Sequence, residues 1–219
     1  MRIVATSVSK GSNGIPLPER TVAFETGSVT LAEAEVGDQP TVLALILSGR
    51  MHADSGTVTL DGAADPGLLQ ERVALVDAPG VSEPAADLSL RAVVKEELMY
   101  AGRSTSRAYI DATLAECGAA GLAGERMGDI PAAVRVRLLA ELAASRPGVQ
   151  GLVITSPDRH GGNPRDWLAV ATELAGRDFA VAVVCGEAAT EIALPLLPPA
   201  PIAADAEPAP ALAELDIEA

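Results

Sequence analysis

The residues best placed to do chemistry lie in the short turn Gly37–Thr41, which reads Gly-Asp-Gln-Pro-Thr. An apolar strand candidate, Ser28–Val36, leads into this turn, and an apolar helical run, Val42–Leu47, follows it. A strand, a tight turn and a helix form a unit that binds phosphate, because the N–H groups at the start of the helix point at the anion. The pattern therefore predicts a phosphate-binding position at four residues of the turn: Gly37, Asp38, Gln39 and Thr41.

The same turn lacks several groups that hold phosphate in proteins. A loop of the form G-x-x-x-x-G-K-[ST] supplies converging backbone N–H groups, a lysine and a hydroxyl that reaches Mg²⁺. This turn has no second glycine and no lysine, Pro40 removes a backbone donor, and Asp38 adds negative charge. We therefore expect a degenerate version of such a loop.

The elements that must position this turn alternate between strands and helices, which predicts an α/β fold. Short β-branched or apolar runs predict the strands, and longer periodic runs predict the helices. The expected strands are Arg2–Val8 at a sheet edge, Thr21–Phe24, Ser28–Val36, Thr57–Leu60, Arg72–Val76, Gly151–Ile154 and Phe179–Cys185. The expected helices are 42–47, 88–99, 104–124, 129–139 and 164–176, and those between about 81 and 127 form an inserted α-helical lobe.

Two stretches carry a resemblance to a known family. The segments Leu47–Arg50 (LSGR) and Asp54–Gly62 (DSGTVTLDG) resemble the sequence just after the Walker A loop of ABC-transporter ATP-binding subunits. Further along, Arg135 and Arg137 match the arginine spacing of the family's signature helix, with Asp129 as its expected cap. The resemblance implies a P-loop NTPase-like fold of the ABC ATPase type, a parallel or mixed sheet flanked by helices, over residues 1–187.

The positions that carry chemistry in that family are altered in this chain. The family's Walker B strand ends in Asp-Glu-Pro, but Thr155 and Ser156 stand before Pro157 here. A hydroxyl is a weak metal contact, and a serine is no general base near neutral pH. Thr155 and Ser156 are thus the expected degenerate Walker B position. No catalytic residue and no metal ligand are expected.

Four isolated residues receive structural interpretations. Asp77 follows a strand and is expected to be a cap or a solvated turn residue. Arg135 and Arg137 are expected on a solvated helix face. His160 is expected on a surface loop, because the sequence shows no general base for it to assist.

Composition restricts the possible partners. The chain of 219 residues has a formal net charge of −14, so a broad basic face for nucleic acid is not expected. Only two cysteines occur, without metal-ligand spacing, and they are expected to be reduced and buried. No apolar run approaches the roughly 20 residues needed to span a bilayer, and no signal peptide is visible, which favours a cytoplasmic protein without direct membrane insertion.

Residues 188–219 are rich in Ala, Pro and acidic residues, which predicts a disordered tail.

Three functions remain open. In the first, the chain is a non-catalytic ABC-type subunit without a nucleotide cofactor, and it serves as a regulatory or structural partner of a membrane permease or a second ATP-binding subunit. Such a protein would be peripheral at the inner face of the membrane. In the second, it is an atypical ATPase that uses Mg·ATP only beside a partner. In the third, it is a small-ligand binding module with a closed polar pocket around Asp38, Gln39 and Thr155.

Overall fold

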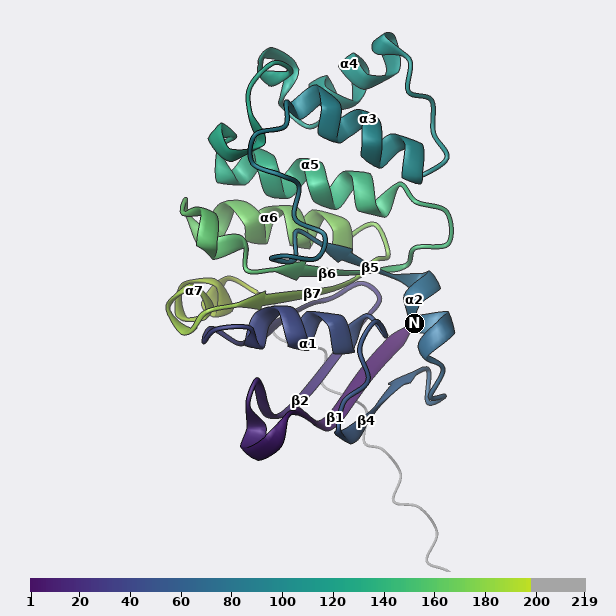
Figure 1. The fold of residues 1–219 in the computed structure, drawn as a ribbon, viewed down its shortest axis with the longest axis vertical. Helices are drawn as coiled ribbons and strands as arrows, with labels where there is room; N and C mark the ends of the chain where they lie inside the picture. Colours follow the sequence, from purple (N-terminus) through teal and green to yellow (C-terminus); the bar gives the residue numbers. More distant parts are fainter. Residues whose placement is uncertain (198–219) are drawn as a thin grey trace, which may run out of the picture.

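The computed structural model describes residues 1–197, which form two β-sheets with helices packed between and beyond them (Figure 1). The parallel sheet has the strand order β3-β7-β6-β5, and the antiparallel sheet has the order β2-β1-β4. The strands are β1 Arg2–Lys10, β2 Leu17–Glu25, β3 Val29–Glu33, β4 Ser55–Leu60, β5 Val73–Val76, β6 Gly151–Thr155 and β7 Ala180–Cys185. The helices are α1 Gln39–Leu47, α2 Pro66–Arg72, α3 Leu90–Tyr100, α4 Arg107–Glu116, α5 Ala132–Ala144, α6 Pro164–Ala175 and α7 Glu187–Ala193.

The parallel sheet is buried on both faces. Three of its four strands, β5, β6 and β7, are apolar along almost their whole length, as expected for strands that helices cover on both sides. Helix α1 covers one face, and α5 and α6 cover the other (Figure 1). The register aligns Val76 with Ile154 and Thr155 with Val184, so β5, β6 and β7 end at one common edge. The α/β class with a parallel sheet between helices is confirmed.

The antiparallel sheet packs on the far side of α1 (Figure 1). Strand β1 lies in its middle, between β2 and β4, so the prediction of an edge strand at Arg2–Val8 was wrong. Alternating polar and apolar residues mark a strand with one solvated face, and a central antiparallel strand satisfies that pattern as well as an edge strand does.

The helical lobe lies beyond α5, at the end of the molecule opposite the antiparallel sheet (Figure 1). It contains α3 and α4, and each helix begins with a serine cap: Ser89 accepts from the Ala92 N–H, and Ser106 accepts from the Tyr109 N–H. These hydroxyls satisfy N–H groups that the first turn of a helix leaves free.

The C-terminal part of the described chain is more regular than predicted. Helix α7 occupies Glu187–Ala193, and a 3₁₀ turn, Leu194–Leu196, follows it. Ala189 and Ala193 are buried against the same apolar cluster as α6. The expected tail boundary at residue 188 was therefore too early, because these small side chains pack on the core. Residues 198–219 of the predicted tail lie outside the described residues. No helix among those described is long and apolar enough to cross a membrane.

Candidate functional site at the carboxyl edge of the parallel sheet

The predicted phosphate position lies where β3 leads into α1. Gly37 takes a positive φ of 55°, which lets the chain turn sharply into the helix. The Gln39 N–H already donates to the Val36 carbonyl at 3.1 Å, and Pro40 has no N–H. Among the described contacts, Thr41 thus keeps the one uncommitted N–H of the helix's first three residues. The Thr41 hydroxyl, however, donates to the Pro79 carbonyl at 3.4 Å.

The other predicted pair, Thr155 and Ser156, lies at the end of β6. Thr155 is completely buried, and its Oγ1 has no hydrogen-bond partner among the described residues. Ser156 takes a left-handed conformation with φ 46°, and its N–H donates to the Val184 carbonyl at 2.7 Å. The next carboxylate, Asp158, accepts the Gly186 N–H at 3.1 Å and so fixes the start of α7.

The centre of this edge is Asp77, the first residue after β5. Its side chain is only 2% exposed, and its backbone takes a left-handed φ of 55°. Arg135 binds the carboxylate with both arms of its guanidinium: Nε donates to Oδ2 at 2.8 Å, and Nη2 donates to Oδ1 at 2.7 Å. The Arg135 side chain is itself only 4% exposed. A bidentate pair of this kind is short, directional and strong.

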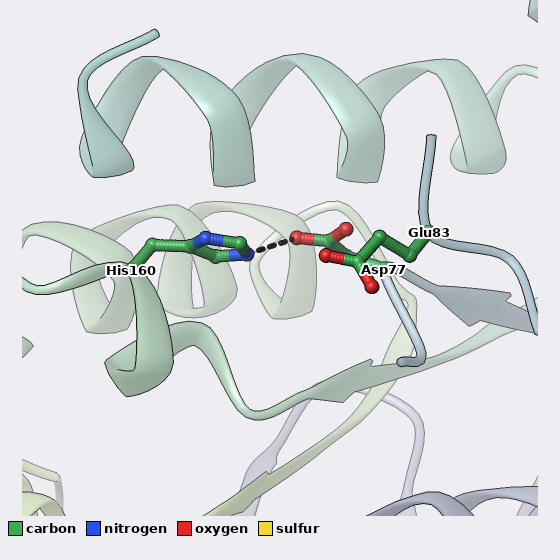
Figure 2. Close-up of side chains that lie close together, drawn as sticks. All are labelled: Asp77, Glu83 and His160. Carbon is green, nitrogen blue, oxygen red and sulfur yellow. Dashed lines mark hydrogen bonds and ion pairs between the residues drawn. The ribbon is translucent and has the colours of Figure 1, made fainter. Parts of the chain in front are cut away.

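Three further side chains complete the group that we call the Asp77 cluster, defined as Asp77, Glu83, Arg135, Arg159 and His160. Arg159 Nη2 lies 3.1 Å from Asp77 Oδ1 and 3.2 Å from Glu83 Oε1 without directing an N–H group at either oxygen. His160 Nε2 lies 3.0 Å from Asp77 Oδ2 (Figure 2). The cluster therefore joins residues after β5, residues after β6 and the start of α5.

The electrostatics of the cluster favour ionised Asp77. Burial alone would raise the pKa of Asp77, but hydrogen bonds from Arg135 and His160 and the charges of both arginines outweigh it, so the pKa is lowered from 3.8. Two carboxylates face two guanidiniums, so the formal charges cancel when His160 is neutral. A balanced and hydrogen-bonded arrangement is what allows charges to remain buried.

The cluster also contains three groups with the donor atoms of a cation site. One ligand atom each from Asp77, Glu83 and His160 lies within 4.8 Å of the others (Figure 2). Both Asp77 oxygens, however, already accept from Arg135, and Arg159 lies beside both carboxylates. A divalent cation would therefore sit next to two fixed positive charges. The geometry fits an ion-pair network and does not fit a metal centre.

Sequence reasoning missed this cluster. Asp77 was interpreted as a cap or a solvated turn residue and Arg135 as part of a solvated helix face, and both interpretations were wrong because both side chains are buried. His160 was expected on a surface loop; it lies in a short 3₁₀ turn with its side chain 19% exposed, and it contacts Asp77. Arg135 and His160 lie 58 and 83 residues from Asp77 along the chain, so no local pattern links them to it. The expected cap was also wrong: Pro131 occupies the N-cap of α5 and makes no side-chain cap, while Asp129 lies in a 3₁₀ turn. Arg137 does reach a partly exposed position, where it bridges to Glu173 at 2.9 Å.

Two cavities in the described chain lie away from this edge. One, of about 190 Å³, lies among α1, β4 and α2, and one of about 360 Å³ lies among α4, α5 and the end of α6. Neither is lined by Asp38, Gln39 or Thr155, the residues of the pocket expected for a small-ligand module. Asp38 is instead exposed to solvent.

Comparison with known proteins identifies the fold. No protein-family model matches the chain, and no curated protein matches it. A nucleotide-free ATP-binding cassette from an ABC transporter superposes with a TM-score of 0.64 at 14% identity, covering 90% of this chain and 85% of that one. A putative ABC transporter ATP-binding protein from Pyrococcus furiosus superposes with a TM-score of 0.60 at 14% identity, covering 85% of this chain and 92% of that one. CbiO1 from Clostridium perfringens, part of the ABC transporter complex cbiONQ, superposes with a TM-score of 0.58 at 15% identity. The match covers 84% of this chain and 77% of that one.

These likenesses define the class of fold. The chain has the fold of an ABC-transporter ATP-binding cassette, with the helical lobe inserted between β5 and α5. At such low sequence identity, structural similarity shows the fold alone. The chemistry depends on the residues of this chain.

Proposed function

We propose that this protein is a non-catalytic ABC-cassette-like subunit that acts as a regulatory or structural partner of a membrane transport complex. The observation that carries the proposal is the use of the sheet's carboxyl edge. Ligands usually bind at this edge of an open α/β sheet. Here the carboxylate of Asp77 forms ion pairs with the guanidiniums of Arg135 and Arg159 at 2.7–3.1 Å, so these charges are already paired within the chain.

The start of α1 supports the proposal. A phosphate cradle needs several converging N–H groups and a cation, whereas the first three residues of α1 keep one uncommitted N–H among the described contacts, no cation stands in the turn, and Asp38 is exposed beside it. Each charge-assisted hydrogen bond contributes about 1.5–3 kcal/mol. Losing the lysine and two or three N–H contacts therefore weakens nucleotide binding by several orders of magnitude, since about 1.4 kcal/mol corresponds to a tenfold change in affinity.

The end of β6 supports it further. Thr155 and Ser156 offer no carboxylate to hold Mg²⁺ or to orient an attacking water. The nearest carboxylate along the chain, Asp158, is bound to the N–H of Gly186. The residues of this edge thus do not fit Mg·ATP, and the chain's role rests on its shape and surface.

The proposed partner is a membrane permease or a second ATP-binding subunit. One protein with a similar structure, CbiO1, is described as part of an ABC transporter complex. The described residues contain no membrane-spanning helix, so this chain would reach the inner face of the membrane through its partner. Chemical cross-linking in intact cells, followed by mass spectrometry, should identify a multi-span membrane protein or an ATP-binding subunit. Cross-links to neither class would count against this role.

Nucleotide binding is the direct test. The full chain is titrated with Mg·ATP at millimolar concentration in a calorimeter, and a thermal melt of the same sample demonstrates that it is folded. We expect no binding heat and no ATP turnover. Micromolar binding, or turnover that Thr41→Ala or Thr155→Ala abolishes, would overturn the proposal and favour the atypical ATPase. The variant Thr113→Ala, in the distant helix α4, is the matched control.

A further inference from the structure

The two segments that join the helical lobe to the core meet at the Asp77 cluster. The outgoing segment, residues 77–89, leaves the end of β5 and reaches α3. The returning segment, residues 127–131, leads from the lobe into α5. Arg135 contacts both: it holds the Asp77 carboxylate at 2.7 and 2.8 Å, and its Nη1 donates to the Met127 carbonyl at 3.2 Å.

The outgoing and returning segments also bind each other directly. The Met127 N–H donates to the Leu88 carbonyl at 2.8 Å, and the Gly128 N–H donates to the Ala86 carbonyl at 2.9 Å. Near its start, the outgoing segment folds onto itself, because the Ala78 carbonyl accepts the N–H groups of residues 81–83 at 3.0–3.1 Å. Both connections therefore behave as one compact unit.

Arg159 fixes this unit to the core. Its Nη1 donates to the backbone carbonyls of Asp77 at 2.7 Å and Thr155 at 2.8 Å, which are the carbonyls at the ends of β5 and β6. Its Nη2 lies between the carboxylates of Asp77 and Glu83. One side chain thereby connects two core strands to the outgoing segment.

We infer that the Asp77 cluster is a lock that holds the helical lobe in one orientation on the parallel sheet without any bound ligand. Moving the lobe would pull the Met127 carbonyl away from the buried Arg135 guanidinium and Glu83 away from Arg135 and Arg159, and a donor left unpaired in a low-dielectric interior is unfavourable. A lobe held in this way presents a surface that is already in its final shape before a partner arrives.

Distance measurement across the molecule tests the lock. Spin labels are placed at Thr57→Cys in β4 and Ala112→Cys in α4, two exposed positions at opposite ends of the structure (Figure 1). The native Cys117 and Cys185 are buried and stay unlabelled in the folded chain. Pulsed electron paramagnetic resonance on the full chain, without nucleotide, should give a single narrow distance distribution.

The decisive variant is Arg135→Met, which should broaden that distribution or add a second distance. The matched control is Arg137→Met, on the same helix, whose partner Glu173 is half exposed; it should leave the distribution unchanged. A broad distribution in the unmodified chain, or an unchanged one in Arg135→Met, would overturn the lock.

A milder variant keeps the test decisive if Arg135→Met does not fold. Glu83 is 36% exposed, so Glu83→Gln weakens the cluster at its outer side. Amide hydrogen exchange in residues 78–89 should then become at least about tenfold faster, while exchange in β1 stays unchanged. Equal exchange in the variant and the unmodified chain contradicts the lock. Because no nucleotide is present in these experiments, their outcome is independent of whether Mg·ATP binds.

Discussion

Replacing Asp77 with asparagine should be among the most damaging single isosteric changes in the core. The carboxylate is 2% exposed and is shared by Arg135, Arg159 and His160 at 2.7–3.1 Å. Asparagine keeps the shape but removes the charge, which leaves the buried guanidinium of Arg135 and the partly buried one of Arg159 facing one carboxylate. Breaking a buried ion pair from one side costs about 3–5 kcal/mol. We expect about 3 kcal/mol, the lower limit, because Glu83 remains within 3.8 Å of both arginines.

Urea denaturation followed by circular dichroism measures this loss. The midpoint should fall with an unchanged slope, because the surface exposed on unfolding stays the same. For a chain of this size the melting temperature should fall by about 6–12 °C. The control is Glu173→Gln, which removes a half-exposed bridge to Arg137 and should change the free energy of unfolding by at most about 1 kcal/mol. Asp77→Asn and Glu173→Gln with equal stability would refute the reasoning that burial makes the Asp77 pairs strong.

Three further predictions concern other parts of the chain. Because the pKa of Asp77 is lowered from 3.8 in the fold, its ionisation stabilises the folded state above that value, and this stabilisation is lost as the pH falls through the lower folded pKa. Urea midpoints below about pH 4 should therefore fall more steeply in the unmodified chain than in Asp77→Asn, and parallel profiles would exclude this role. Burial raises the pKa of Cys117 and of Cys185 to about 11, so iodoacetamide should alkylate both only after unfolding; rapid labelling of the native chain would contradict it. Gly56→Ala should lose more stability in thermal melts than Gly62→Ala by about 1–3 kcal/mol, because both positions have positive φ but only the new Cβ at 56 would lie 2.3 Å from a backbone oxygen. Equal losses would show that strain in φ alone decides the effect.

Local patterns were sufficient for most of the fold. The apolar runs at Val73–Val76 and Ala180–Cys185 are buried parallel strands, as their composition indicated. Helix α6 follows the predicted stripe from Pro164, with Asn163 capping the Arg165 N–H at 3.0 Å. Such elements are readable because periodicity, caps and flanking glycines all lie within a few residues of one another.

Patterns failed where an element's neighbours decide its state. Strand β1 was expected at a sheet edge but lies in the middle of the antiparallel sheet. Alternation of polar and apolar residues indicates that one face of a strand is solvated, but it does not indicate how many strands pair with it. Helix α7 was assigned to a disordered tail on composition, although Ala189 and Ala193 are small enough to pack closely on the core. The predicted nucleotide positions at Gly37–Thr41, Thr155 and Ser156 remain predictions.

The sequence by itself determined which chemical groups are absent from this protein. No lysine stands in the turn Gly37–Thr41, and no carboxylate stands at Thr155 or Ser156, whatever the fold does with these positions. Only the tertiary structure decided where the remaining charges go. Asp77 and Arg135 are 58 residues apart and carry no shared local signal, yet the chain crossing from β5 through the lobe to α5 brings them within 2.7 Å. Burial then makes that contact strong, because a charge pair removed from water is screened far less than one on the surface.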